Sequence, residues 1–130
     1  MTIQLDHLIV PSRDRRAAAE RLGAILGVPW AADANIGPFS PVFVSDSLTL
    51  DFDQHDEPFP LLHYCFHVSD AEFDAILGRI QAMGVPYRST PMGPADMKVN
   101  THHGGRIVYW SEPDGHAWEV LTVSYARRGG

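Results

Sequence analysis

The sequence contains one cysteine, Cys65, and one lysine, Lys98, among 130 residues. A single cysteine excludes an intrachain disulfide framework and is typical of a reducing compartment, so we expect a cytoplasmic protein. Ten Lys and Arg residues against 16 Asp and Glu residues give a formal net charge of −6. Nucleic-acid binding needs clustered basic side chains, and the pair Arg127-Arg128 is too small a cluster. We therefore expect no nucleic-acid partner.

Long apolar runs are also missing. No stretch approaches the ~20 apolar residues that cross a bilayer, and Met1–Asp6 lacks the basic-then-apolar order of a signal peptide. We expect neither a membrane partner nor a targeting segment. With 45% hydrophobic residues, the chain has enough apolar material for the core of a single domain over residues 1–130. Seven histidines are the unusual feature that remains.

The chain repeats one pattern. A short apolar run containing His7 is followed by a helical pattern that ends in Gly27-Val28-Pro29-Trp30. A second run containing His63 is followed by a helical pattern that ends in Gly84-Val85-Pro86-Tyr87. The offset is 56 residues at the histidines and 57 at the glycines. We interpret the chain as a duplicated unit, with a first module at 1–56 and a second at 60–125.

Both modules are predicted to fold as a strand, a helix and three further strands. Ser69 and Glu72 have the spacing of a capping box at the start of the second helix, which Gly84 ends. Asp14 and Gly27 delimit the first helix. The segment 91–104 has no periodicity and is typical of a lid or a mobile loop. The expected strands are 5–10, 28–32, 40–45 and 48–53, then 63–68, 87–90, 105–111 and 117–124.

Polar side chains recur on one face of the first and last strand of each module. Because successive strand residues point to opposite faces, the larger apolar side chains of these strands would pack on the helices. The opposite faces would then carry four polar residues around one point: His7, Asp51, His63 and Glu119. Two imidazoles and two carboxylates form an environment suited to a first-row divalent metal ion.

These residues carry a resemblance to a known family. Leu5-Asp6-His7 opens the first strand, His63 opens the fifth, and the turn Glu112-Pro113-Asp114-Gly115 leads to Glu119. From Leu5 to Tyr125 the sequence resembles the vicinal oxygen chelate superfamily, which includes glyoxalases, bleomycin-resistance proteins, extradiol dioxygenases and fosfomycin-resistance enzymes. The resemblance implies an α+β fold. Two tandem βαβββ modules would form one cup-shaped, eight-stranded half-open barrel with the helices outside.

The resemblance also implies one metal ion bound by the first and last strands of each module. His7, His63 and Glu119 match the usual ligand types. Asp51 stands where glyoxalase I has a Glu. Its side chain is one methylene shorter, so it either ligates directly, acts through water or orients a ligand histidine. Iron, nickel, zinc and manganese are all compatible with this donor set.

Four further residues are candidates for contact with a substrate. His102 in the segment 100–106 would be an acid–base group on a closing loop, or a solvent-exposed histidine. Tyr109 would donate to a substrate oxygen, or reach water from the edge of the core. Arg106 would bind an anionic group, or lie on the surface. His67 shares the strand face of His63 and would contact substrate or lie at a wet rim.

The leading hypothesis is a divalent-metal-dependent enzyme whose small-molecule substrate chelates the metal through adjacent oxygens. Asp51 or Glu119 would move the proton, with His102 or Tyr109 as alternatives. The class covers isomerases, lyases, epimerases and ring-cleaving oxygenases. The alternative is a metal-free protein that sequesters a bleomycin-type drug, for which an acidic surface is suitable. The resemblance also leads us to expect a homodimer.

Overall fold

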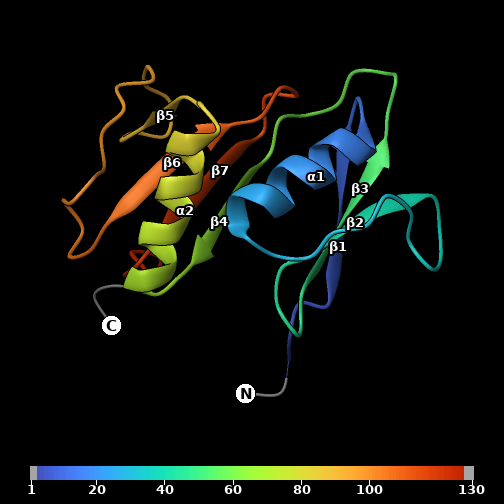
Figure 1. Cartoon of the computed structure of the whole chain (residues 1–130), viewed down its shortest axis with the longest axis horizontal. Coiled ribbons are helices and arrows are strands. Elements are labelled where there is room, and N and C mark those ends of the chain that lie inside the picture. The colour runs from blue at the N-terminus through green and yellow to red at the C-terminus, as the bar shows by residue number, and fades with distance from the viewer. Residues whose placement is uncertain (1–2, 128–130) are drawn as a thin grey trace. The chain divides into compact units, whose positions relative to one another are not determined.

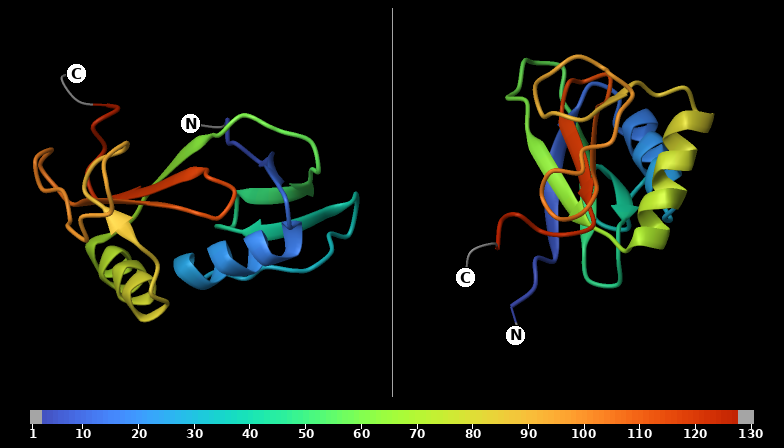
Figure 2. Two further views of the ribbon diagram at one scale, coloured as in Figure 1. Left: turned by 90° about the horizontal axis from the view of Figure 1, so that it is seen from above. Right: turned by 90° about the vertical axis from the view of Figure 1, so that its left-hand side faces the viewer.

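The computed structural model describes residues 3–127, and the chain forms two compact units, Met1–Pro60 and Leu61–Gly130. Each unit contains one helix that lies along one face of its own sheet (Figure 1, Figure 2). No helix within residues 3–127 is long and apolar enough to cross a membrane.

The first unit has a three-stranded sheet in the order β1-β3-β2. β1 and β3 are parallel, and β2 is antiparallel to β3. Its elements are β1 (His7–Ser12), α1 (Arg15–Leu26), β2 (Phe39–Phe43) and β3 (Thr49–Gln54).

Helix α1 begins and ends at the residues that the sequence indicates. The Asp14 carboxylate accepts the backbone N–H of Ala17, and Gly27 adopts φ +71°, which a residue without a Cβ reaches at no steric cost. The buried face of the helix includes Leu22 and Ile25, which pack toward the sheet. This packing leaves the opposite face of the sheet available for polar side chains.

The second unit has a four-stranded sheet in the order β4-β7-β6-β5. β4 and β7 are parallel, and the other neighbours are antiparallel. Its elements are β4 (His63–His67), α2 (Asp70–Ala82), β5 (Tyr87–Arg88), β6 (Ile107–Ser111) and β7 (Ala117–Leu121).

The predicted capping box at the start of α2 is confirmed. Ser69 Oγ accepts the backbone N–H of Glu72, and the Glu72 carboxylate accepts the backbone N–H of Ser69. Gly84 follows the helix with φ +68°. The helix buries Phe73, Ile76 and Ile80, as the helical period predicts.

One predicted strand is nearly absent. The segment 28–32 forms only an isolated bridge between Trp30 and Val42, with hydrogen bonds from Ala31 and Phe43 on either side of it. Pro29 has no N–H to extend the ladder, so pairing ends there. The α+β class with two tandem modules is confirmed. Eight strands were predicted, whereas residues 3–127 form seven strands, with one bridge in place of the predicted strand at 28–32.

The two sheets have the same register at their parallel strands. In the first unit His7 pairs with Thr49, so Asp51 lies opposite Ile9. In the second unit His63 pairs with Ala117, so Glu119 lies opposite Cys65. Each carboxylate therefore stands one strand away from its histidine, two residues further along. The internal repeat in the sequence is a repeat in the structure.

Candidate active site

The carboxylate of Glu119 is the centre of a polar cluster in the second unit. Glu119 lies in the middle of β7, and its side chain is fully buried. His63 on β4 approaches it closely, with Nε2 2.8 Å from Glu119 Oε1. Within residues 3–127 no Lys or Arg forms an ion pair with Glu119. Burying a carboxylate is costly unless a cation or several hydrogen-bond donors compensate it, so the groups around Glu119 decide how its charge is balanced.

Neutral donors surround the same carboxylate. The Tyr125 hydroxyl donates to Glu119, 3.0 Å from Oε1 and 2.9 Å from Oε2. Tyr109 on β6 and Cys65 on β4 are the strand partners of Glu119, and the charge of Glu119 acts on both side chains. Three neighbouring strands therefore direct their side chains to one point on the sheet face.

The surroundings of Glu119 raise the pKa values of the neighbouring thiol and phenol groups. Burial, and then the nearby Glu119 charge, raise the pKa of Cys65 to about 12 and that of Tyr109 to about 12. Burial and the hydrogen bond to Glu119 also raise the pKa of Tyr125. The thiol and both phenols are therefore protonated donors at neutral pH. Because the thiolate is the nucleophilic form of cysteine, a protonated Cys65 is not an activated nucleophile.

A buried histidine fixes where β4 begins. His116, fully buried, accepts the backbone N–H of Leu62 at Nδ1, 3.0 Å away. The Ala117 N–H donates to the Leu62 carbonyl at 2.9 Å. His63 follows directly, so the turn before β7 sets the register that carries His63 to Glu119.

The corresponding site in the first unit is more open. His7 Nδ1 lies 2.8 Å from the Asp6 carboxylate, and the His7 side chain is 60% exposed. The hydrogen bond to Asp6, and to a smaller extent the charge of Asp51, raise the pKa of His7. Burial raises the pKa of Asp51, whose carboxylate accepts no hydrogen bond from residues 3–127.

The four predicted ligands thus form two pairs, one pair in each unit. His63 and Glu119 are in contact, and Asp51 acts electrostatically on His7. Among residues 3–127, no three His, Cys, Asp or Glu side chains gather closely enough to hold a metal ion together. Convergence of all four ligands stays a prediction.

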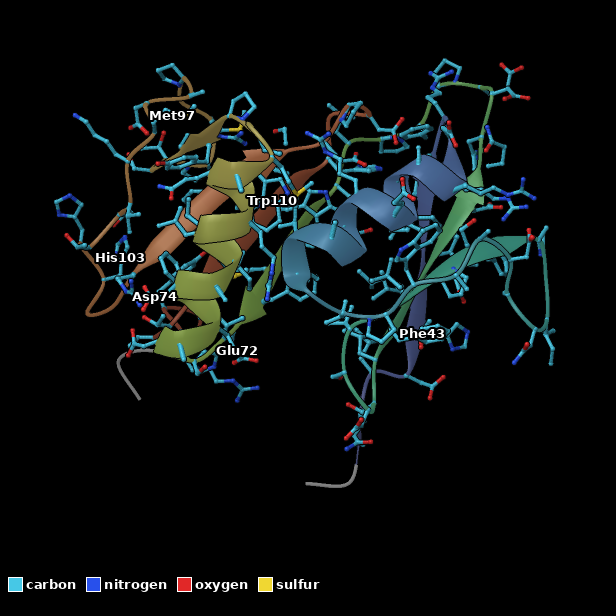
Figure 3. The ribbon with its side chains drawn as sticks, in the orientation of Figure 1. Phe43, Glu72, Asp74, Met97, His103 and Trp110 are labelled. Carbon is cyan, nitrogen blue, oxygen red and sulfur yellow. The ribbon has the colours of Figure 1, made fainter. Side chains whose placement is uncertain are left out.

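The other candidate residues have the following places. The His67 ring lies 3.0 Å from the Thr122 carbonyl. His102 is in an exposed turn capped by Asn100. The ring centroid of its neighbour His103, which is labelled in Figure 3, lies 5.7 Å from that of Tyr125. Only Tyr109 among these candidates joins the Glu119 cluster.

Arg106 forms ion pairs with two acidic residues of α2. Its guanidinium donates to Asp74, which is labelled in Figure 3, at 2.6 Å and to Asp70 at 3.0 Å. It also stacks over the Phe73 ring at 4.4 Å. The role of Arg106 in binding an anionic substrate stays a prediction.

Two polar residues of the second unit, Tyr125 and Arg88, were not predicted from the sequence. Tyr125 lies beyond the end of β7, where the chain turns and strand alternation no longer indicates direction. Arg88 lies on the two-residue strand β5, too short for alternation to indicate a face. Both carry polar groups toward the side of the sheet that bears His63.

Comparison with solved structures identifies the relatives of this chain. It is 44% identical to a protein named oxidase ChaP-H1, over 99% of this chain and all of that one, with a TM-score of 0.84. The chain belongs to the vicinal oxygen chelate superfamily. A protein named oxidase ChaP-H2 is 38% identical over the full length of both chains, with a TM-score of 0.86.

More distant structures share the vicinal oxygen chelate fold. A glyoxalase/dioxygenase from Nostoc punctiforme is 18% identical over 93% of this chain and 91% of that one, with a TM-score of 0.67. No family model matches the sequence, and no curated protein is similar to it. The predicted family is confirmed by the solved structures.

Proposed function

We propose that this chain is a divalent-metal-dependent oxidase acting on a small molecule that presents two adjacent oxygens. The observation that carries the proposal is the buried Glu119 carboxylate, which contacts His63 and has no Lys or Arg partner within residues 3–127. The likeness to two oxidases over the full chain supports enzymatic activity. It also favours oxidation over the isomerase, lyase and epimerase reactions of the same family.

The donor set fits a first-row divalent ion. Imidazole nitrogen and carboxylate oxygen are shared ligands of iron, nickel, zinc and manganese. His63 and Glu119 would hold the ion in the second unit, with His7 and Asp51 as the further predicted ligands. When bound, the metal would supply Lewis acidity and, if it is iron, redox chemistry with dioxygen. We expect iron first, because two histidines and one carboxylate are the ligands of many iron oxygenases.

The chain's own residues would orient the ligand and manage protons. Tyr125 donates to both oxygens of Glu119 and therefore fixes the plane of the carboxylate. Tyr109, whose raised pKa keeps its proton, would donate a hydrogen bond to a substrate oxygen near His63; the two rings lie 6.3 Å apart. Asp51 and His102 stay predicted proton carriers.

The test is the metal content of tag-free protein, measured by mass spectrometry. We expect close to one ion per site in the wild type and loss of that ion in His63→Ala and Glu119→Gln. His55→Ala is the matched control, because His55 pairs with Asp53 and belongs to no proposed ligand set. It should retain the metal.

Absence of metal after reconstitution with iron, nickel, zinc and manganese in turn would contradict the proposal. Drug binding that survives metal removal would then support the sequestering alternative. The homodimer and the cytoplasmic location stay predictions.

A further inference from the structure

A pocket of about 650 Å³ opens beside His63 within the second unit. This volume is within the range of small-molecule sites, ~300–1,000 Å³. Leu62 and Met92 are among its apolar walls, and Met92 is 95% exposed. Its polar members are His63, Arg88 and Ser111. An apolar pocket with a few fixed polar groups is the usual form of a ligand site.

The sheet gives the pocket a floor with two polar ends. Ala117 on β7 pairs with His63 on one side and with Ser111 on the other. Paired residues of neighbouring strands point to the same face, so these three side chains form one row. Neighbouring strands lie ~4.8 Å apart, which puts His63 and Ser111 about 10 Å from each other. The small Ala117 methyl leaves the space between them open.

Arg88 stands at the Ser111 end of this row. Its guanidinium donates to Ser111 Oγ at 3.0 Å, to the Thr90 carbonyl at 3.1 Å and to the Pro91 carbonyl at 2.9 Å. These contacts hold the group in place without neutralising it. Within residues 3–127 no carboxylate pairs with Arg88, whereas Arg106 is paired with two. A fixed arginine of this kind, with N–H groups to spare, is suited to an anionic oxygen group.

We propose that this pocket binds an elongated, largely apolar molecule that carries an anionic oxygen group, such as a carboxylate or phenolate, at the Arg88 end. The other end of the molecule, about 10 Å away across Ala117, reaches His63. That second placement rests on the proposed function, under which the adjacent oxygens of the substrate lie at His63. Arg88 is then a specificity-determining residue for a substrate with an anionic oxygen group.

The test uses two fluorescent probes that differ by one anionic group. 1-Anilinonaphthalene-8-sulfonate is anionic, and N-phenyl-1-naphthylamine is the same aromatic skeleton without the sulfonate. Arg88→Gln should raise the dissociation constant of the anionic probe about tenfold and leave that of the neutral probe within about twofold. Ala117→Leu fills the floor and should weaken both probes. Arg16→Gln, an equal charge change in the first unit, should weaken neither.

Three results would overturn the inference. In the first, the anionic probe binds equally to the wild type and to Arg88→Gln. In the second, Arg88→Gln weakens the binding of both probes alike, which would mean that Arg88 only supports the loop. In the third, Ala117→Leu changes the affinity of neither probe. The thermal transition of each variant is measured in parallel, so that probe binding is compared between folded proteins. Because probe binding and metal content are separate measurements, failure of this proposal is distinguishable from failure of the metal site.

Discussion

The two units share a strand register but surround their carboxylates differently. Glu119 is fully buried and accepts hydrogen bonds from His63 and Tyr125, with Tyr109 and Cys65 beside it. Asp51, at the equivalent register position, is half-buried and accepts none from residues 3–127. The scaffold has been duplicated, whereas the hydrogen-bonding network belongs to the second unit alone.

The difference follows from what covers each sheet. In the second unit β6 pairs with β7 and brings Tyr109 beside Glu119, and the chain then turns back to bring Tyr125 over it. In the first unit the residue opposite Asp51 on β2 is Pro41, which has neither a donor N–H nor a polar side chain. The strand neighbour of the carboxylate, tyrosine in one unit and proline in the other, is therefore one source of the difference, and the turn that carries Tyr125 is the second.

The largest expected effect separates the two carboxylates. Glu119→Ala should lower the free energy of unfolding by about 2–3 kcal/mol, because buried donors lose their acceptor. Asp51→Ala should cost less than about 1 kcal/mol, because the Asp51 carboxylate satisfies no donor. Urea unfolding of metal-free protein measures both values. Equal costs would show that the Glu119 network adds no stability beyond what the Asp51 carboxylate provides.

An effect of intermediate size is expected from replacing one glycine in each helix, with opposite signs for the change in stability. A Cβ at Gly23 of α1 would lie 2.9 Å from Cδ1 of Trp30, whereas a Cβ at Gly78 of α2 would meet nothing within 4 Å. Gly23→Ala should therefore destabilise the protein by about 1–3 kcal/mol. Gly78→Ala should stabilise it by about 0.5–1 kcal/mol, since alanine loses less backbone entropy in a helix. Thermal unfolding of the two variants gives the signs, and stabilisation by Gly23→Ala would contradict the packing of Trp30.

The smallest expected effect concerns the capping box of α2, which α1 lacks because Ala17 stands at the equivalent position. The hydrogen bonds with Ser69 lower the pKa of Glu72 below its ordinary value. The stabilisation from Glu72 is therefore fully present above its unfolded-state pKa of about 4.3 and is lost as the pH falls through the lower folded-state value. Urea unfolding of wild type and Glu72→Gln should show a gap that narrows from pH 6 to pH 3. A gap independent of pH would argue against the capping contact.

Local signals in the sequence predicted most of the fold. The caps at Asp14 and Ser69 and the glycines after both helices act within a few residues, so their effects were readable from spacing. Strand alternation correctly placed Leu50 and Trp118 in the core and their neighbours on the other face. The strand predicted at 28–32 is only a bridge, because Pro29 has no N–H to donate to the strand ladder and the apolar pattern does not show this.

The site was less accessible to sequence reasoning. Contact between His63 and Glu119 followed from the repeat and the register. Tyr125 and Arg88 depend on where a turn and a two-residue strand direct their side chains, and no periodicity covers such short segments. Arg106 was a candidate because it enters a predicted strand, but only the structure shows that its guanidinium is shared by Asp70 and Asp74, while Arg88 has no acidic partner within residues 3–127.

The placement of the tryptophans gives each unit its own optical signal. Trp30 is the only tryptophan in residues 1–60 and is half-buried, whereas Trp110 and Trp118 in the second unit are each 1% exposed. Indole emission shifts to shorter wavelength in apolar surroundings, so the second unit emits at the blue side of the spectrum. Replacing Trp30, or the other two, by phenylalanine isolates the unfolding of one unit inside the whole chain. Coincident transitions would define one cooperative domain, and separate transitions would define two.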